Sequence, residues 1–247
     1  MLVKSQVKYI QSLSQKKLRD EAGVFVAEGP KLINELLRSA NIRAQQIFAT
    51  EEWVADNPEP KTQNPELITV STSELERLSF QQTPNQVIGI FTKPVFPKTI
   101  SWNNTLSLML DTIQDPGNMG TIMRCADWFG IKQVVCSRDS ADVFNPKVVQ
   151  SSMGSIGRVQ VFYEDLGHFL NEHDSVPVYA ATLDGADLYT MQGIQSGIIL
   201  IGNESKGIHE ELLAKSRYRI TIPKKGEAES LNAAVATGII LSHLVKF

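Results

Sequence analysis

The stretch LSLMLDTIQDPGNMGTIMRCADWFG, residues 106–130, decides the fold class. Its apolar start at 106–110 predicts a strand, and the polar residues 114–118 predict a turn. Beyond the turn, Ile122, Ala126 and Phe129 recur at helical spacing, and Gly130 is placed to end the helix. A further apolar run at 133–136 predicts the next strand. A strand, a helix and a strand in this order indicate an α/β fold.

The alternation continues in both directions from this unit. Towards the C-terminus the apolar runs predict strands at 159–162, 178–182, 197–201 and 220–222, followed by a long apolar helix at 231–245. The run at 198–201 is apolar without alternation, which is typical of strands covered on both faces in a parallel sheet. Towards the N-terminus the pattern predicts strands at 24–27, 47–50 and 67–70, a helix starting at Pro30 and another capped by Ser71.

Two prolines in residues 93–99 favour a linker between two α/β domains. We therefore predict a smaller domain at 1–93, a linker at 94–103 and a second domain at 104–247. The chain has 247 residues, enough for two cores of ordinary size.

Composition excludes several classes of protein. No stretch approaches about 18 uninterrupted apolar residues, and the N-terminus has no signal-peptide pattern, so we expect no membrane segment. Two cysteines, Cys125 and Cys136, fit a reducing cytoplasm. The four histidines lack metal-ligand spacing, so we expect no metal. The net charge is −3, but residues 1–43 hold eight basic and four acidic side chains, which makes this end the place for a polyanion to dock.

Three polar segments follow predicted strands, where α/β sheets bind ligands. Residues 115–124 place two glycines and a proline at a helix N-terminus, with Arg124 about two turns further on. Residues 202–207 hold Glu204 between two glycines, in a spacing that is neither a P-loop nor a dinucleotide fingerprint. In the third segment Ser230 is a natural N-cap, and Asn232 is costly just inside an apolar helix. From spacing alone, a solvated arginine and an ordinary strand-to-helix turn stay open as alternatives.

The three segments, QDPGNMGTIMRCAD (114–127), LIGNESKGI (200–208) and IPKKGEAESLNAAVATGI (222–239), together resemble the motifs of the SpoU (TrmH-like) 2′-O-ribose RNA methyltransferases. Residues 14–37 resemble the L30e-like substrate-binding domain that often precedes that catalytic domain. The resemblance implies methyl transfer from S-adenosylmethionine to a ribose 2′-hydroxyl of RNA, with rRNA favoured and tRNA possible. It also implies an α/β domain with a C-terminal trefoil knot (a SPOUT fold), and a homodimer.

The resemblance carries roles over to matching positions. It places Asn118, Arg124, Glu204, Ser230 and Asn232 at the catalytic centre, and Thr182, Gly202, Asn203, Ile222 and Leu231 around the cofactor. Ser205 departs from the family pattern, which frequently has glycine there. Because a guanidinium stays protonated in proteins, we expect Arg124 to grip a phosphate and stabilise alkoxide charge rather than act as the base.

Two alternatives stay open. One is a related knotted methyltransferase acting on a base, although the Ser-Leu-Asn segment at 230–232 favours ribose. The other is a non-catalytic RNA-binding or assembly factor, against which the complete set of site residues argues. Failure to bind S-adenosylmethionine would favour this second alternative.

Overall fold

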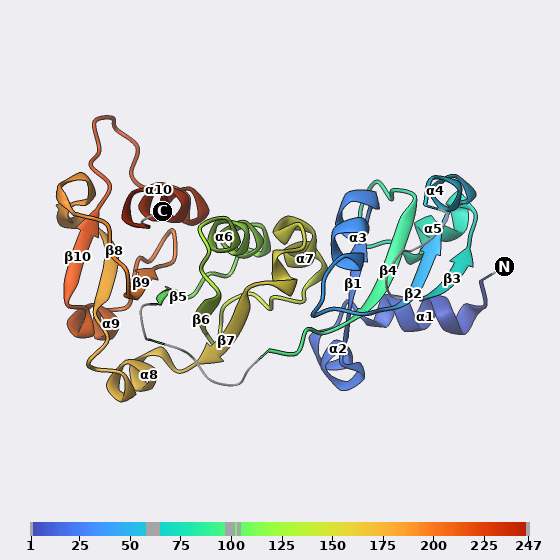
Figure 1. Cartoon of the computed structure of the whole chain (residues 1–247), viewed down its shortest axis with the longest axis horizontal. Coiled ribbons are helices and arrows are strands. Elements are labelled where there is room, and N and C mark those ends of the chain that lie inside the picture. Colours follow the sequence, from blue (N-terminus) through green and yellow to red (C-terminus); the bar gives the residue numbers. More distant parts are fainter. Residues whose placement is uncertain (1, 58–64, 97–101, 103–104, 246–247) are drawn as a thin grey trace. The chain divides into compact units, whose positions relative to one another are not determined.

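The computed structural model describes residues 2–57, 65–96, 102 and 105–245, which fold into two compact units (Figure 1). The first unit comprises Met1–Phe96 and Asp142–Gly157, and the second comprises Pro97–Ala141 and Arg158–Phe247. Residues 142–157 therefore pack in the first unit, although they lie in sequence between two strands of the second. The compact units do not coincide with the continuous boundaries 1–93 and 104–247, and the predicted linker lies largely outside the described residues.

The first unit is built on a four-stranded sheet in the order β1-β4-β2-β3. Its strands are β1 (Val24–Glu28), β2 (Ala44–Ala49), β3 (Glu66–Thr69) and β4 (Val87–Thr92). The three predicted strands are confirmed with small shifts at their ends. Strand β4, which is not among the predicted strands, lies antiparallel between β1 and β2. This interior position explains why five of its six residues are buried.

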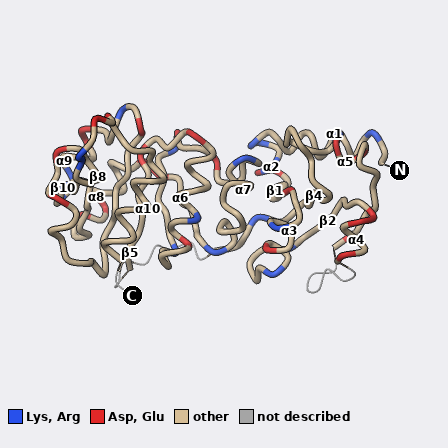
Figure 2. Tube along the Cα trace, turned by 90° about the horizontal axis from the view of Figure 1, so that it is seen from above, with Lys and Arg blue, Asp and Glu red and all other residues tan. Residues whose placement is uncertain are grey.

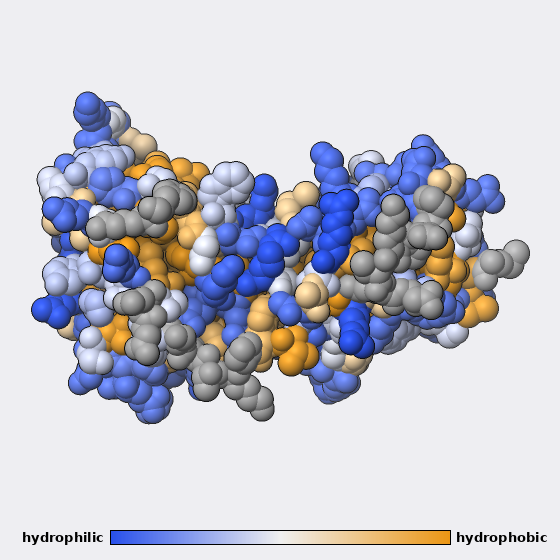
Figure 3. All heavy atoms as spheres, in the orientation of Figure 1, coloured by the Kyte–Doolittle hydropathy of each residue, from blue (hydrophilic) through white to orange (hydrophobic). Residues whose placement is uncertain are grey.

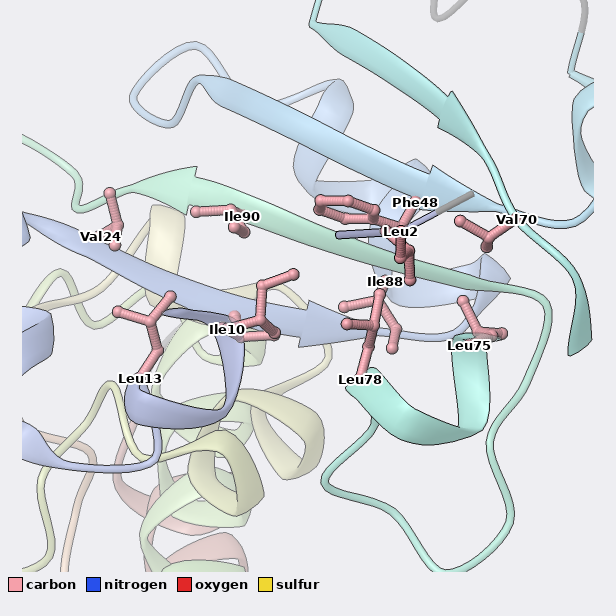
Figure 4. Close-up of a cluster of buried hydrophobic side chains, with 11 residues drawn as sticks. Leu2, Ile10, Leu13, Val24, Phe48, Val70, Leu75, Leu78, Ile88 and Ile90 are labelled. Atoms are coloured by element: carbon pink, nitrogen blue, oxygen red, sulfur yellow. The ribbon is translucent and has the colours of Figure 1, made fainter. Parts of the chain in front are cut away.

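Five helices from the N-terminal sequence surround this sheet: α1 (Lys4–Ser12), α2 (Lys16–Ala22), α3 (Pro30–Leu37), α4 (Glu51–Asp56) and α5 (Thr72–Leu78). Pro30 is the first residue of α3, as predicted. Ser71 caps α5 in a capping box, in which its hydroxyl accepts from the Glu74 N–H. Apolar side chains of α1 and α5, among them Ile10 and Leu78, pack on the sheet residues Ile88 and Ile90 to form a buried core (Figure 4).

The inserted segment 142–157 is fixed to this unit by a buried ion pair. Its helix α7 (Pro146–Ser152) packs against β1. Arg19, only 1% exposed, donates from Nη2 to the Asp142 carboxylate at 2.5 Å, and from Nη1 to the carbonyls of Leu13 and Ser14. A buried guanidinium without a counter-charge is costly, so Asp142 ties the segment to α2.

Replacing Asp142 by alanine is expected to lower the free energy of unfolding of the first unit by about 3–5 kcal/mol, because the Arg19 charge stays buried without its partner. Hydrogen exchange of the β1 amides reports this loss. The matched control is Glu21→Ala, which removes the exposed partner of Lys17. Exposed pairs contribute about 0–1 kcal/mol. Equal stability of the two variants would contradict the assigned role of Asp142.

The second unit is built on a six-stranded sheet in the order β10-β8-β9-β5-β6-β7, in which every described pairing is parallel. Its strands are β5 (Leu106–Leu110), β6 (Gln133–Ser137), β7 (Gln160–Glu164), β8 (Val178–Asp187), β9 (Gly197–Ile201) and β10 (Tyr218–Thr221). The predicted parallel sheet is confirmed. Strand β8 extends beyond the predicted end at residue 182. Its pairing with β9 ends at Ala180, but Ala186 and Asp187 pair with β10 further along.

The helices of this unit are α6 (Pro116–Trp128), α8 (Leu166–Glu172), α9 (Glu210–Lys215) and α10 (Ala233–Leu244), with α6 packed against α10. Helix α6 begins earlier than predicted, since the Asp115 side chain caps it and Pro116 is its first residue. Gly117 and Asn118 therefore lie in its first turn rather than in a loop. At the other end Gly130 has φ +74°, and the Ile131 N–H donates to the Ala126 carbonyl. This geometry confirms Gly130 as the residue that ends the helix.

The two cysteines and the longest apolar helices can now be placed in the structure. Cys136 is fully buried and Cys125 is half-buried, and burial raises the pKa of both thiols. Both therefore stay protonated, as small apolar residues of the core do. Within the ranges that the structure describes, no helix is both long and apolar enough to cross a membrane.

Candidate active site

Three of the predicted catalytic residues converge on one carboxylate oxygen in the second unit. Glu204 Oε1 accepts from Asn118 Nδ2 at 2.5 Å and from Asn232 Nδ2 at 2.9 Å. It also accepts from the backbone N–H of Ala233 at 3.0 Å. Asn232 Nδ2 lies 2.8 Å from Asn118 Oδ1, which closes the cluster. The first turn of α6, the loop after β9 and the start of α10 are thereby joined by charge-assisted hydrogen bonds.

Asn232, and not Ser230, is the N-cap of α10. Its Oδ1 accepts from the backbone N–H groups of Ala234 and Val235 at 3.0 and 3.2 Å. The interpretation of Ser230 as the cap, with Asn232 inside the helix, is therefore wrong. Asparagine caps helices as well as serine does, so Asn232 carries no propensity cost here. Within the described residues the exposed Ser230 hydroxyl forms no hydrogen bond, and it does not join the cluster.

Arg124 lies on the exposed face of α6, two turns after its first residue. Its guanidinium forms no hydrogen bond or ion pair with any residue that the structure describes. It shares this face with Thr121 and Trp128, which lie three residues before it and four residues after it. An exposed arginine without an internal partner keeps all five N–H donors for a ligand, and its planar fork suits a phosphate.

The loop that carries Glu204 is held by its own backbone and by Asn203. The N–H and carbonyl of Asn203 pair with those of Gly207 at 3.0 and 2.9 Å. Asn203 Oδ1 accepts from the N–H groups of Ser205 and Lys206, and its Nδ2 donates to the Thr112 carbonyl. The Asn203 side chain, predicted to bind the cofactor, is thus engaged in shaping the loop.

Gly202 is the residue at which this loop tolerates no side chain. A Cβ at Gly202 would lie 2.5 Å from the Gly207 carbonyl carbon. We expect Gly202→Ala to lower the free energy of unfolding by about 1–3 kcal/mol, because the backbone must move apart. Thermal unfolding measures this loss. Gly226→Ala is the matched control, since a Cβ at Gly226 meets open space, and an equal loss in both variants would contradict the assignment.

The predicted cofactor residues lie at one edge of the sheet. Strands β10, β8 and β9 are neighbours and parallel, so their carboxyl ends meet at the same edge. Gly202 follows β9, Ile222 follows β10, and Thr182 lies where β8 has left β9. The Thr182 hydroxyl is buried and has no hydrogen-bond partner among the residues that the structure describes. A buried hydroxyl without a partner is costly, so this edge has capacity for a polar ligand group. Leu231 is 44% exposed, next to Asn232.

Sequence reasoning missed four residues that support the cluster. Asp115 Oδ1 accepts from the Asn118 N–H at 2.8 Å and so fixes the start of α6. An aspartate before proline at a predicted helix start is a signal that could have found it. Asp111 and Thr112 hold the loop that carries Glu204 by hydrogen bonds with His209 and Asn203, which lie far from them in sequence. No local pattern marks those pairings.

Comparison with known proteins covers both units. Residues 4–89 match the sequence model of the MRM3-like substrate binding domain, and residues 105–242 match that of the SpoU rRNA Methylase family. Fold and site thus define the chain as an RNA methyltransferase that carries its own substrate-binding domain. It belongs to the SpoU rRNA Methylase family.

The chain is also similar, along nearly its whole length, to individual RNA methyltransferases. The 23S rRNA (guanosine(2553)-2′-O)-methyltransferase RlmP of Bacillus subtilis is 31% identical over 97% of this chain and 95% of its own. A TrmH-family protein of known structure from Porphyromonas gingivalis is 37% identical, with a TM-score of 0.84 over 98% of this chain and 97% of its own. The AdoMet-bound rRNA methyltransferase from Sinorhizobium meliloti is 29% identical, with a TM-score of 0.83 over 98% of this chain and 94% of its own.

Proposed function

We propose that this protein transfers the methyl group of S-adenosylmethionine to a ribose 2′-hydroxyl of rRNA. The observation that carries the proposal is the Glu204 cluster with Asn118 and Asn232, on the same unit as Arg124, whose guanidinium bonds to none of the described residues. RlmP, which resembles this chain along nearly its whole length, is named as a 2′-O-methyltransferase of 23S rRNA, which supports ribose and rRNA over a base and tRNA.

The cofactor supplies a methyl group on a sulfonium, which leaves as a neutral thioether. The protein would then have to align the two reactants, so that the ribose oxygen approaches the methyl carbon opposite the carbon–sulfur bond. Such alignment can lower the barrier by about 7–11 kcal/mol. In the proposal Arg124 binds the phosphate beside the reacting ribose and stabilises the charge that develops on the 2′-oxygen. The hydroxyl proton leaves to water.

The cofactor is proposed to bind at the carboxyl edge of β8, β9 and β10, against main chain at Gly202, Ile222 and Leu231. The buried Thr182 hydroxyl, which has no hydrogen-bond partner in the described part of the chain, supports this position. The AdoMet-bound relative from Sinorhizobium meliloti supports the identity of the cofactor. In this arrangement Glu204 and the two asparagines keep the edge in one shape and orient the start of α10.

The first unit is proposed to bind the RNA. Figure 2 shows basic residues at α2, which carries Lys16 and Lys17, and at α3, which carries Lys31, in the part of the sequence where basic residues exceed acidic ones. The match to a substrate-binding domain supports this role.

We further propose a homodimer and a trefoil knot, both implied by the resemblance. Support for the dimer comes from apolar side chains on α6 and α10: Trp128 is 82% exposed and Val235 is 51% exposed. The space-filling view shows apolar surface over the position of α10 (Figure 3). Large exposed apolar groups on two packed helices are typical of an interface. The cytoplasm is the proposed compartment.

Depletion of the protein in its native cell tests the function. Ribose methylations are mapped across rRNA and tRNA in the depleted and the complemented cells. We expect one or a few rRNA positions to lose their 2′-O-methyl group and to regain it on complementation. A lost base methylation would identify a base methyltransferase instead, and an unchanged map would overturn the proposal.

A further inference from the structure

The glutamate loop, residues 202–209, is attached at both ends to the two residues that follow β5. At its start Asn203 Nδ2 donates to the Thr112 carbonyl at 2.8 Å. At its end the His209 N–H donates to Asp111 Oδ2 at 2.8 Å, and His209 Nδ1 lies 2.9 Å from both carboxylate oxygens of Asp111. We call these four residues (Asp111, Thr112, Asn203 and His209) the clamp.

Asp111 is the buried part of the clamp. Its side chain is 2% exposed, whereas the His209 side chain is 61% exposed. A buried carboxylate requires hydrogen bonds, and Asp111 receives them from His209 and from the Thr112 hydroxyl. Because an ionised carboxylate only accepts, His209 Nδ1 carries the hydrogen. The His209 ring therefore shields the carboxylate at the solvent side and pulls the end of the loop onto β5.

Thr112 is held in an unfavourable backbone conformation. Its φ is +58°, a left-handed value that β-branched residues rarely adopt. Such residues persist only where their neighbours impose the conformation. Here the Thr112 N–H donates to Ser137 Oγ at 2.8 Å, and its hydroxyl lies 3.0 Å from Asp111 Oδ1 and 3.2 Å from Asp139 Oδ2, which share its one hydrogen. The pKa of Asp139 lies below its usual value, first because Ser137 donates a hydrogen bond to it. The Thr112 hydroxyl and the nearby His209 lower this pKa further. The imposed conformation is the one in which the Thr112 carbonyl meets Asn203.

We propose that the clamp positions Glu204 for the reaction and that His209 is its specific positioning residue, acting through Asp111 without touching the substrate. Between the two attachment points the loop holds one oxygen of Glu204 against Asn118 and Asn232. Loss of the His209 side-chain bond leaves its backbone N–H as the remaining bond to Asp111, which loosens this end of the loop and the position of the acceptor that the three donors share. The catalytic consequence rests on the proposed function, whereas the effect on the loop does not.

Variants at His209 separate the hydrogen bond from the bulk of the ring. Asparagine carries its amide nitrogen at the position of Nδ1 and can donate to Asp111, whereas glutamine carries it at the position of Nε2. We expect His209→Ala and His209→Gln to lower the single-turnover methyl-transfer rate by about tenfold at saturating RNA and cofactor, as the loss of one hydrogen bond to a charged group predicts. His209→Asn is expected to stay within about threefold of the wild type by the same measure. RNA affinity stays unchanged in all three.

Backbone amide hydrogen exchange of residues 205–207 gives a readout that needs no activity. We expect faster exchange in His209→Ala and His209→Gln, and wild-type exchange in His209→Asn. The matched control is His168→Ala, which removes an exposed histidine whose neighbour is Glu172, and it should leave rate and exchange unchanged.

The proposal is overturned if His209→Ala keeps wild-type exchange at 205–207, or if His209→Asn exchanges as fast as His209→Ala in a folded protein. A wild-type rate in His209→Ala overturns the catalytic role. If the wild-type chain itself transfers no methyl group, the proposed function fails, and the exchange data still decide whether the clamp holds the loop.

Discussion

Replacing Arg124 by alanine is expected to lower the methyl-transfer rate by about 10²–10³-fold, the range found when one donor that stabilises a developing oxyanion is removed. The guanidinium forms no bond within the described structure, and it lies on the exposed face of α6. Its loss should therefore leave the fold intact. The cofactor is proposed to bind at the edge of β8, β9 and β10, so its affinity should change little. Single-turnover rates and calorimetric cofactor titration measure the two quantities.

Arg124→Lys distinguishes the planar fork from simple charge. Lysine keeps the positive charge but cannot bind a phosphate with two parallel hydrogen bonds, so most of the loss should remain. A near-wild-type rate in Arg124→Lys would exclude a role for the fork. Collapse of cofactor affinity in Arg124→Ala would show instead that the residue serves the fold or the cofactor. Arg217→Ala, which removes another exposed arginine of the same unit, is the control.

Replacing Glu204 by alanine is expected to have a comparable effect, about 10²-fold on the rate, because one change removes the acceptor of three hydrogen bonds. The amides of Asn118 and Asn232 and the N–H of Ala233 all donate to the same oxygen. Without it the loop after β9 is no longer bonded to the first turn of α6 and the start of α10, and only the Asn232–Asn118 hydrogen bond of the cluster remains. Glu204→Gln keeps one carbonyl oxygen and loses the charge, so it should lie between alanine and the wild type.

A double-mutant cycle tests whether the cluster acts as a unit. If it does, Asn232→Ala should cost less in a Glu204→Ala background than in the wild type, because one of the two acceptors of the Asn232 amide is already gone. Additive effects of the two changes on the rate would contradict the shared role. Glu52→Ala, at an exposed glutamate in the first turn of α4, is the control for the loss of a surface carboxylate.

Much of the fold was predictable because local patterns decide it. Strands β5 and β9 were predicted at the residues where they occur, since both are short apolar runs bounded by turn-forming residues. The end of α6 at Gly130 follows from glycine's tolerance of a positive φ. Of the five catalytic residues that the family resemblance predicted, Asn118, Glu204 and Asn232, spread over 115 residues of sequence, form one cluster.

The features that could not be predicted from the sequence depend on contacts between residues far apart in the chain. Nothing local distinguishes Ser230 from Asn232 as the cap of α10, since both residue types cap helices. The choice is made by Glu204, which binds Asn232 from another loop. The placement of residues 142–157 in the first unit depends on Arg19, more than a hundred residues earlier. The clamp is of the same kind, since Asp111 and His209 are 98 residues apart.

Transfer of the methyl group to a ribose 2′-oxygen is tested by locating the transferred methyl group on the RNA. The purified protein is incubated with unmodified rRNA and S-adenosylmethionine labelled in its methyl group, and the RNA is digested to nucleosides. We expect label in a 2′-O-methylnucleoside and its loss in Arg124→Ala. Label on a base, or no transfer to rRNA by a protein that binds the cofactor, would contradict it.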